Sequence, residues 1–201
     1  MNAYSLNDPI KYYSDTDIEG TQYTALMNWA LDHSDTVMLV YQLSCTSDEF
    51  NQNLLSIRDN LSKHRIYTRS VPPEWPGTTA CYPDLAEIAE IRKFIPNYTL
   101  PDPSLYIDFY TITPEFRQYV LSAGHIRGWL TPNFPEDIAF FTQGKCWFFT
   151  TIHEQYYTIC GLHPGTREKL ESLGIIFDEY QISDKDLWIE PGLLPSTTDS
   201  Q

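Results

Sequence analysis

Cysteine is scarce in this chain, and none of its cysteines has the spacing of a metal or redox site. The four that occur form no C-x-x-C pair, and they are Cys45, Cys81, Cys146 and Cys160. This spacing argues against a zinc ribbon and a thioredoxin-type centre. In a reducing compartment we expect buried thiols that pack as small hydrophobic residues.

Long hydrophobic runs are also missing. The nearest approach is 36–43, TVMLVYQL, which is far shorter than the ~20 residues of a membrane-spanning helix. The first residues, MNAYSLND, have neither the basic nor the apolar region of a secretory signal. We therefore expect a cytoplasmic protein that does not interact with membranes.

The common nucleotide, hydrolase and metal motifs are absent as well. The sequence has no G-x-G-x-x-G, Walker loop, G-x-S-x-G or HExxH, and Asp15-Thr16-Asp17 lacks the rest of an EF-hand loop. The histidines at 125, 153 and 163 are scattered without ligand spacing. We expect no cofactor and no metal site.

Positive charge is in short supply: 13 Lys and Arg stand against 27 Asp and Glu, for a net charge of -14. Residues 1–35 contribute -5 (six acids, one lysine) and residues 170–201 contribute -6 (seven acids, one lysine), which leaves -3 for 36–169. Acidic ends around a near-neutral centre disfavour nucleic acid and steer a basic protein surface toward the chain.

The basic residues are dispersed along the chain, and the one local cluster is Arg58, Lys63, His64, Arg65 and Arg69. In so acidic a chain, we interpret this group as partners of internal salt bridges rather than as a nucleic-acid site.

Hydrophobic periodicity predicts the elements of the first half. Apolar residues spaced as on a helix face predict a helix over 20–33, and an apolar run with β-branched residues predicts a buried strand over 36–43. A capping box, Thr46 to Glu49, opens a helix to about 61, and alternation predicts a strand over 64–71. Residues 36–71 should thus form a β-α-β unit, and 84–94 a further helix.

The second half follows a Pro-rich connection, 96–103. Here we predict a strand, a helix, a hairpin of aromatic strands, a helix and a last strand, over 105–112, 113–123, 137–152, 166–173 and 175–180. Thr113 and Pro114 supply an N-cap and a proline for the first of these helices, and Gln143-Gly144 forms the turn of the hairpin. The whole predicts an α+β fold with a mixed or mostly antiparallel sheet and helices packed on one side.

We expect one compact domain over 1–190. It would contain two sub-structures of similar size, 20–95 and 104–190. Residues 191–201 have little to bury, and we expect them to form a disordered tail.

The predicted hairpin is rich in aromatic residues. It carries Phe140, Phe141, Trp147, Phe148 and Phe149 within ten residues. Two interpretations stay open, because cores and interfaces use the same aromatic residues. The hairpin is either packed on both faces or an anchor patch for a partner.

A nucleophile, a base and an orienting acid occur together only in Cys146, His153 and Glu154. A thiol needs a nearby imidazole for activation. Seven residues separate Cys146 from His153 on one predicted strand, roughly 20 Å at ~3.3 Å per residue. Catalysis by these residues would therefore need a sharp bend in the chain.

Several of these residues also carry a resemblance to a family. The resemblance begins with the turn 74–78 (EWPGT) and the segment 134–137 (FPED). It continues with single residues, which are Phe140, Phe141, Gly144, Trp147, Thr150, His153 and Glu154. The pattern resembles uncharacterised bacterial proteins with a WPGT turn followed by a PEDL-F-G-W-T-HE segment, although Ile138 stands where that pattern has leucine. The resemblance implies a bacterial or phage setting and assigns no catalytic residue.

Two functions follow as hypotheses. The first is an acidic inhibitor of the immunity type, or a phage anti-defence inhibitor, that occludes a partner protein with a basic surface. Trp188 would be its anchor among acidic residues, the contact set being Asp178, Glu179, Asp184, Asp186, Trp188 and Glu190. The second is a small-molecule enzyme that uses Cys146 and His153 in a pocket between sheet and helix. The first needs no catalytic group, and we expect it to hold.

Overall fold

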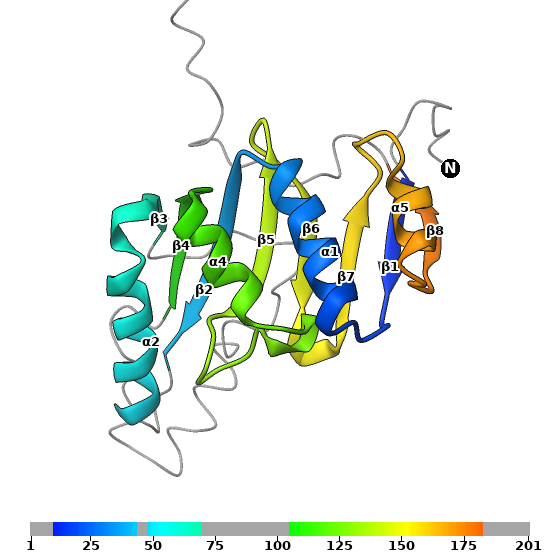
Figure 1. Ribbon diagram of the computed structural model, residues 1–201. Helices are drawn as coiled ribbons and strands as arrows, with labels where there is room; N and C mark the ends of the chain where they lie inside the picture. The colour runs from blue at the N-terminus through cyan, green and yellow to red at the C-terminus, as the bar shows by residue number, and fades with distance from the viewer. Residues whose placement is uncertain (1–9, 44–47, 70–104, 183–201) are drawn as a thin grey trace, which may run out of the picture.

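An eight-stranded antiparallel sheet forms the centre of the computed structural model, which describes residues 10–43, 48–69 and 105–182 (Figure 1). The strands lie in the order β3-β4-β2-β5-β6-β7-β1-β8. Their bounds are β1 Ile10–Ser14, β2 Thr36–Gln42, β3 Arg65–Arg69, β4 Leu105–Thr111, β5 Glu136–Thr142, β6 Lys145–Thr151, β7 Tyr156–Cys160 and β8 Asp178–Gln181.

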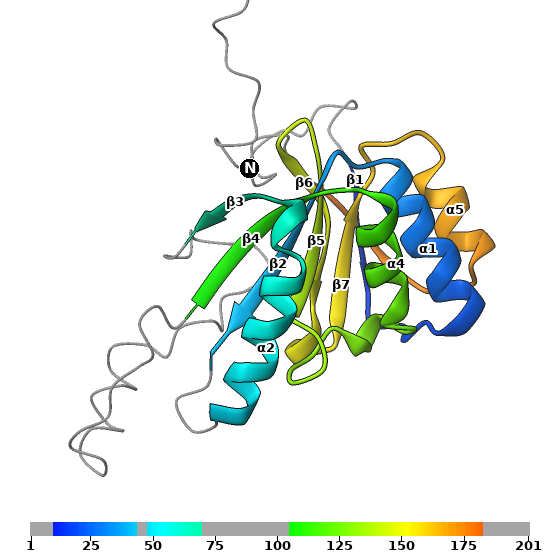
Figure 2. The ribbon, with the colours of Figure 1, turned by 60° about the vertical axis from the view of Figure 1, so that its left-hand side comes forward.

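The described α-helices all cover one face of this sheet (Figure 2). They are α1 Gly20–Asp32, α2 Asp48–Asn60, α4 Pro114–Ser122 and α5 Thr166–Ser172, with short 3-10 helices η1 Ser62–His64, η2 Ile126–Gly128 and η3 Ile152–Glu154. The predicted α+β fold with a mostly antiparallel sheet is therefore confirmed. No helix among the described residues has the length and hydrophobicity needed to cross a membrane.

The main core lies between the helices and this face of the sheet. The apolar stripe predicted for the first helix is buried, and it consists of Tyr23, Leu26, Met27, Ala30 and Leu31. Residues from all four described α-helices join the same cluster, together with Tyr41, Phe140 and Trp147 from the sheet. At α4 the predicted N-cap is present, because the hydroxyl oxygen of Thr113 accepts a hydrogen bond from the backbone N–H of Phe116 (3.2 Å).

The opposite face of the sheet carries a second apolar cluster. Its buried members are Met38, Val40, Ile107, Phe109, Ala139, Phe141, Cys146 and Phe149. Side chains alternate across a strand, so β2 sends Leu39 and Tyr41 to the main core and Met38 and Val40 to the second cluster. This explains why the sequence of β2 is apolar without interruption.

The aromatic hairpin β5–β6 belongs to the interior. Four of its five aromatic side chains are fully buried and Phe149 is 4% exposed. A register shift on β6 turns both Trp147 and Phe148 to the main core, while Phe141 and Phe149 join the second cluster. Of the two interpretations left open above, the structure supports packing on both faces.

Two strands, β4 and β1, lie in the sheet between strands that are not their neighbours in the sequence. The predicted unit β2–α2–β3 is present, but β4 pairs with both of its strands and separates them. Strand β1, which the sequence analysis did not predict, pairs with β7 on one side and β8 on the other. The stretches 20–95 and 104–190 thus contribute strands to a single sheet.

The last strand begins later than predicted. We expected a strand over 175–180, whereas β8 is Asp178–Gln181. Gly174 has φ +68° after α5, and the backbone N–H of Ile175 donates to the carbonyl of Leu170 (3.1 Å). Ile175 is buried as part of this helix end. Its hydrophobic side chain therefore belongs to the helix terminus rather than to the strand.

Several predictions fall on other parts of the chain. The first residues of the capping box, the helix at 84–94, the connection at 96–103 and the tail at 191–201 lie outside the described residues.

Candidate functional site

The face of the sheet opposite the helices carries a group of tyrosines at the β8 end. Tyr12 of β1 belongs to the main core, so alternation places Tyr13 on the opposite face. Tyr13 pairs with Thr158 of β7 on one side and with Asp178 of β8 on the other. Strand pairing therefore gathers side chains from three strands around Tyr13.

Two further tyrosines lie beside it. The rings of Tyr13 and Tyr156 contact each other at a centroid distance of 4.8 Å. Tyr180 lies two residues after Asp178 on β8, on the same face, and is 54% exposed. Tyr13 and Tyr156 are each partly buried. The three rings thus form an aromatic surface, of which Tyr180 is the most exposed part.

Carboxylates surround these rings. Burial, followed by the negative charges of Asp15, Glu154 and Asp178, raises the pKa of Tyr13. Burial also raises the pKa of Tyr156, and Glu154 adds to that shift. All three acids are exposed. We call Tyr13, Tyr156, Tyr180, Asp15, Glu154 and Asp178 the tyrosine–carboxylate patch.

Among the described residues, Lys11 borders this patch. Lys11 pairs with Tyr180 across β1 and β8, and its Nζ lies 5.7 Å from the ring centroid of Phe149. This cation–π contact directs the lysine toward the apolar second cluster. The three carboxylates therefore dominate the charge of the patch.

The predicted partner-binding residues separate onto two faces. Asp178 belongs to the tyrosine–carboxylate patch, whereas Glu179 pairs with Tyr12 and so lies on the helix-covered face. There Glu179 forms an ion pair with Arg167 of α5 (2.5 Å), which also binds Glu171 (2.9 Å). Asp184, Asp186, Trp188 and Glu190 lie outside the described residues.

The structure does not bring together all three residues of the enzyme hypothesis, Cys146, His153 and Glu154. Cys146 lies near the start of β6 in the second apolar cluster, and burial raises the pKa of its thiol well above the ordinary value. His153 follows the other end of β6. Its Nδ1 lies 3.5 Å from Glu136 and its Nε2 lies 3.7 Å from Glu154. The structure thus joins His153 to Glu154 and places Cys146 at the far end of the strand.

A buried carboxyl group lies next to this histidine pair. One oxygen of Asp137 accepts hydrogen bonds from the backbone N–H of Ile152 (2.8 Å) and from the hydroxyl of Thr150 (3.4 Å). Glu136, Asp137, Thr150 and His153 therefore gather at one end of the β5–β6 hairpin. Within the described ranges no group of three or more potential metal ligands has the geometry to hold a metal ion.

The tyrosines of the patch were not predicted from the sequence. Each lies far from the others along the chain, and only the pairing of β1 with β7 and β8 brings them together. The repeated tyrosines at 12–13 and 156–157 were an available signal, because adjacent aromatic residues on a strand must occupy both of its faces. Comparison of the chain with models of protein families, with curated proteins and with solved structures found no match.

Proposed function

We propose that the protein binds and occludes a partner protein with a basic surface, as an inhibitor of the immunity type or as a phage inhibitor of host defence. The observation that carries this proposal is the tyrosine–carboxylate patch, in which three tyrosine rings lie near three exposed carboxylates. Nothing in this activity requires a catalytic group.

The composition of the patch suits a cationic partner. Tyrosine is enriched at interface hot spots because its ring buries a large area at a small cost in side-chain entropy. Its ring face also attracts lysine and arginine. Carboxylates around the rings would pair with the same cations and would disfavour acidic competitors.

The charge of the whole chain supports the same partner. A net charge of -14 attracts a basic protein over distances of about a Debye length, so association should be fast at low salt and slower as salt rises. The patch would then provide the short-range contacts that hold the complex.

The test begins with capture of a partner on the immobilised protein at low salt. The captured protein is identified, and its binding kinetics are measured over a series of salt concentrations. The double variant D178N/E154Q should slow association and flatten its salt dependence, because it removes two charges from the patch. Y180A should mainly speed dissociation, by about tenfold or more if the ring is a hot spot.

Matched controls remove charge elsewhere. Glu168 of α5 and Asp59 of α2 are exposed and lie outside the patch. The variant E168Q/D59N loses the same number of charges, so it reports the effect of net charge alone. If the patch variants bind as wild type does, or if the control variant loses as much affinity as they do, the proposed site is wrong.

A further inference from the structure

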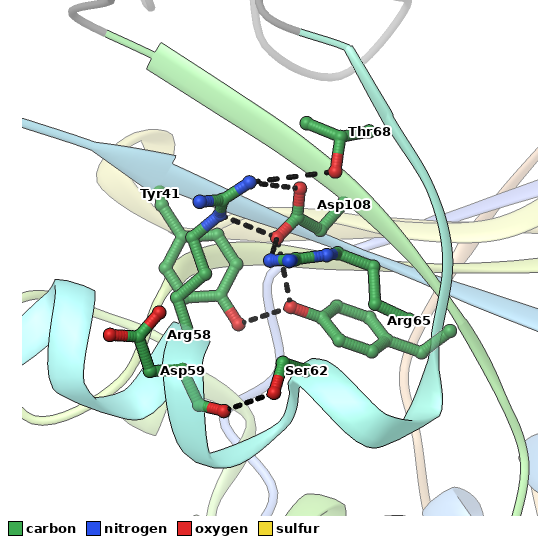
Figure 3. Close-up of polar contacts among 8 residues, drawn as sticks. Tyr41, Arg58, Asp59, Ser62, Arg65, Thr68 and Asp108 are labelled. Carbon is green, nitrogen blue, oxygen red and sulfur yellow. Dashed lines mark hydrogen bonds and ion pairs between the residues drawn. The ribbon is translucent and has the colours of Figure 1, made fainter.

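The β3 edge of the sheet, opposite the tyrosine–carboxylate patch, contains a buried carboxylate that is shared by two arginines. Asp108 of β4 is 0% exposed. Figure 3 shows the guanidinium groups of Arg58 and Arg65 converging on its carboxylate. Arg58 comes from α2 and Arg65 from β3, so the network joins both elements to the centre of the sheet.

The hydrogen bonds of Asp108 fix the position of both guanidinium groups. Arg58 donates through Nε (2.6 Å) and Nη2 (3.1 Å), and Arg65 donates through Nη1 (3.1 Å). The hydroxyl of Tyr110 donates a fourth bond (3.2 Å). The guanidinium carbon of Arg58 also lies 3.9 Å from the ring centroid of Tyr106. Both arginines are thereby held in place before any ligand arrives.

One carboxylate cannot neutralise two guanidinium groups. Tyr41 and Tyr110 are joined by a hydroxyl–hydroxyl hydrogen bond (2.7 Å). Burial raises the pKa of each phenol well above its usual range, so both remain uncharged. No ion pair links Asp59 to either arginine in the part of the chain that the structure describes. The network therefore keeps one positive charge in excess.

Several N–H donors of the two arginines make no hydrogen bond within this network. A guanidinium group has five N–H donors, and in this network Arg65 uses only Nη1 while Arg58 uses only Nε and Nη2. Their side chains are 25% and 14% exposed. Part of each arginine side chain is therefore accessible to solvent.

We propose that Arg58 and Arg65 form a binding site for a single oxyanion group, a carboxylate or a phosphate, with Asp108 as the residue that positions them. Two fixed guanidinium groups match the oxygen geometry of either anion and can donate to two of its oxygens. The excess charge makes such an anion favourable, and the fixed geometry lowers the entropy lost on binding. This site is independent of the function proposed above, and lies at the opposite edge of the sheet.

The experiment titrates the folded protein with inorganic phosphate, with acetate, and with chloride at matched ionic strength. Binding is followed by the Nε–Hε NMR signals of Arg58 and Arg65 and by thermal unfolding. We expect saturable shifts of both signals with phosphate or acetate and none with chloride. A stronger response to phosphate assigns the ligand to phosphate compounds, and a stronger response to acetate assigns it to carboxylates.

Three variants test the roles within the site. R65Q should weaken oxyanion binding about tenfold or more, as expected for the loss of a charge-assisted hydrogen bond. R117Q is the matched control, because Arg117 forms a single ion pair with Asp32 (2.6 Å) at another place on the surface. D108N removes the charge that holds both guanidinium groups in place, so it should bind oxyanions more weakly than wild type, whereas a purely structural network predicts no binding in either protein.

The variants are first compared with wild type by circular dichroism and thermal unfolding, and R65K replaces R65Q if the glutamine variant does not fold. R65K keeps the charge but loses the planar fork, so it should bind more weakly than wild type. The proposal is overturned if phosphate and acetate act no differently from chloride, or if the arginine 65 variant binds as tightly as wild type.

Discussion

Asp137 is fully buried at the start of β5, and only one of its carboxylate oxygens makes hydrogen bonds. The other oxygen, Oδ2, has no hydrogen-bond partner. Burial raises the pKa of this carboxyl group well above its ordinary value, and the nearby charge of Glu136 adds to the shift. An acid whose pKa is raised by folding binds more protons in the folded state, so stability falls as pH rises above the unfolded value of about 3.9.

We expect the variant D137N to remove this loss of stability. Asparagine keeps the acceptor for the N–H of Ile152, carries no charge, and tolerates the backbone conformation at φ +60°. At pH 7 the free energy of unfolding of D137N should be higher than that of wild type by on the order of 1 kcal/mol. Urea unfolding at acid and at neutral pH gives the change in unfolding free energy with pH for each protein. The difference between D137N and wild type reports Asp137 alone, because Glu136 is present in both proteins.

The variant D137A provides the comparison. It also removes the charge but leaves the buried N–H of Ile152 without an acceptor, which should cost about 1–3 kcal/mol. Equal losses in D137N and D137A would show that the charge of Asp137 stabilises the fold, contrary to this prediction.

Cys146 distinguishes the binding hypothesis from the enzyme hypothesis. Its thiol is buried beside Phe141 and Phe149 and its pKa is raised, so the reactive thiolate is disfavoured. We expect C146S to keep full partner binding and biological activity while losing about 1–3 kcal/mol of stability, because a hydroxyl enters an apolar cluster. Chemical unfolding and the activity of the folded variant test this. A folded C146S that is inactive would favour the enzyme.

At the scale of elements, a cluster of rings joins α1 to the connection between β7 and α5. The centroid of the His163 ring lies 4.5 Å from the ring centroid of Trp147 and 5.0 Å from the ring centroid of His33. The Nε2 atom of His163 is buried and has no hydrogen-bond partner. Burial, followed by the nearby His33, lowers the pKa of His163. A base whose pKa is lowered by folding contributes full stability above its unfolded value, and that contribution is lost as pH falls through about 6.5.

The variant H163F should therefore reduce the loss of stability in mild acid. Phenylalanine keeps a ring against Trp147 but takes up no proton. Between about pH 7.5 and 5.5 the free energy of unfolding should fall more in wild type than in H163F. Tryptophan fluorescence during urea unfolding measures this. The exposed His125 gives a control, H125Q, and identical slopes in wild type and H163F would contradict the prediction.

The sequence predicted those elements whose evidence is local. The stripe of α1, the proline and cap of α4, and the Gln143-Gly144 turn of the hairpin each lie within a few neighbouring residues. Strands β1 and β7 have five residues each, and neither was predicted from the sequence. The insertion of β4 between β2 and β3 depends on pairing between distant segments, which periodicity does not record.

The candidate site was harder to predict for the same reason. Acidic residues near the end of the chain indicated Asp178, but its role depends on Tyr13 and Tyr156, which reach it only through the sheet. Glu179 has the same residue type and a neighbouring position, yet it faces the helices and pairs with Arg167. Which side of a strand a carboxylate occupies follows from register, and register follows from the burial of Tyr12.

At the scale of the whole molecule, the two edges of the sheet differ in charge. The edge at β3 holds two arginines around one buried aspartate, and the edge at β8 holds tyrosines among carboxylates. A chain of net charge -14 therefore still has a local site for an anion. The tyrosine–carboxylate patch and the oxyanion site lie too far apart in the sheet to share a side chain, so variants in one should leave the other unchanged.

The position of β1 between β7 and β8 has a consequence for folding. This strand is the first described element in the chain, yet both of its partners are among the last. During synthesis, β1 therefore leaves the ribosome long before any strand with which it can pair. Contacts between such distant segments require closure of a large loop and slow the folding of a domain. The tyrosine–carboxylate patch is complete only once β8 has joined the sheet, so a nascent chain would not display this surface before β8 has been synthesised.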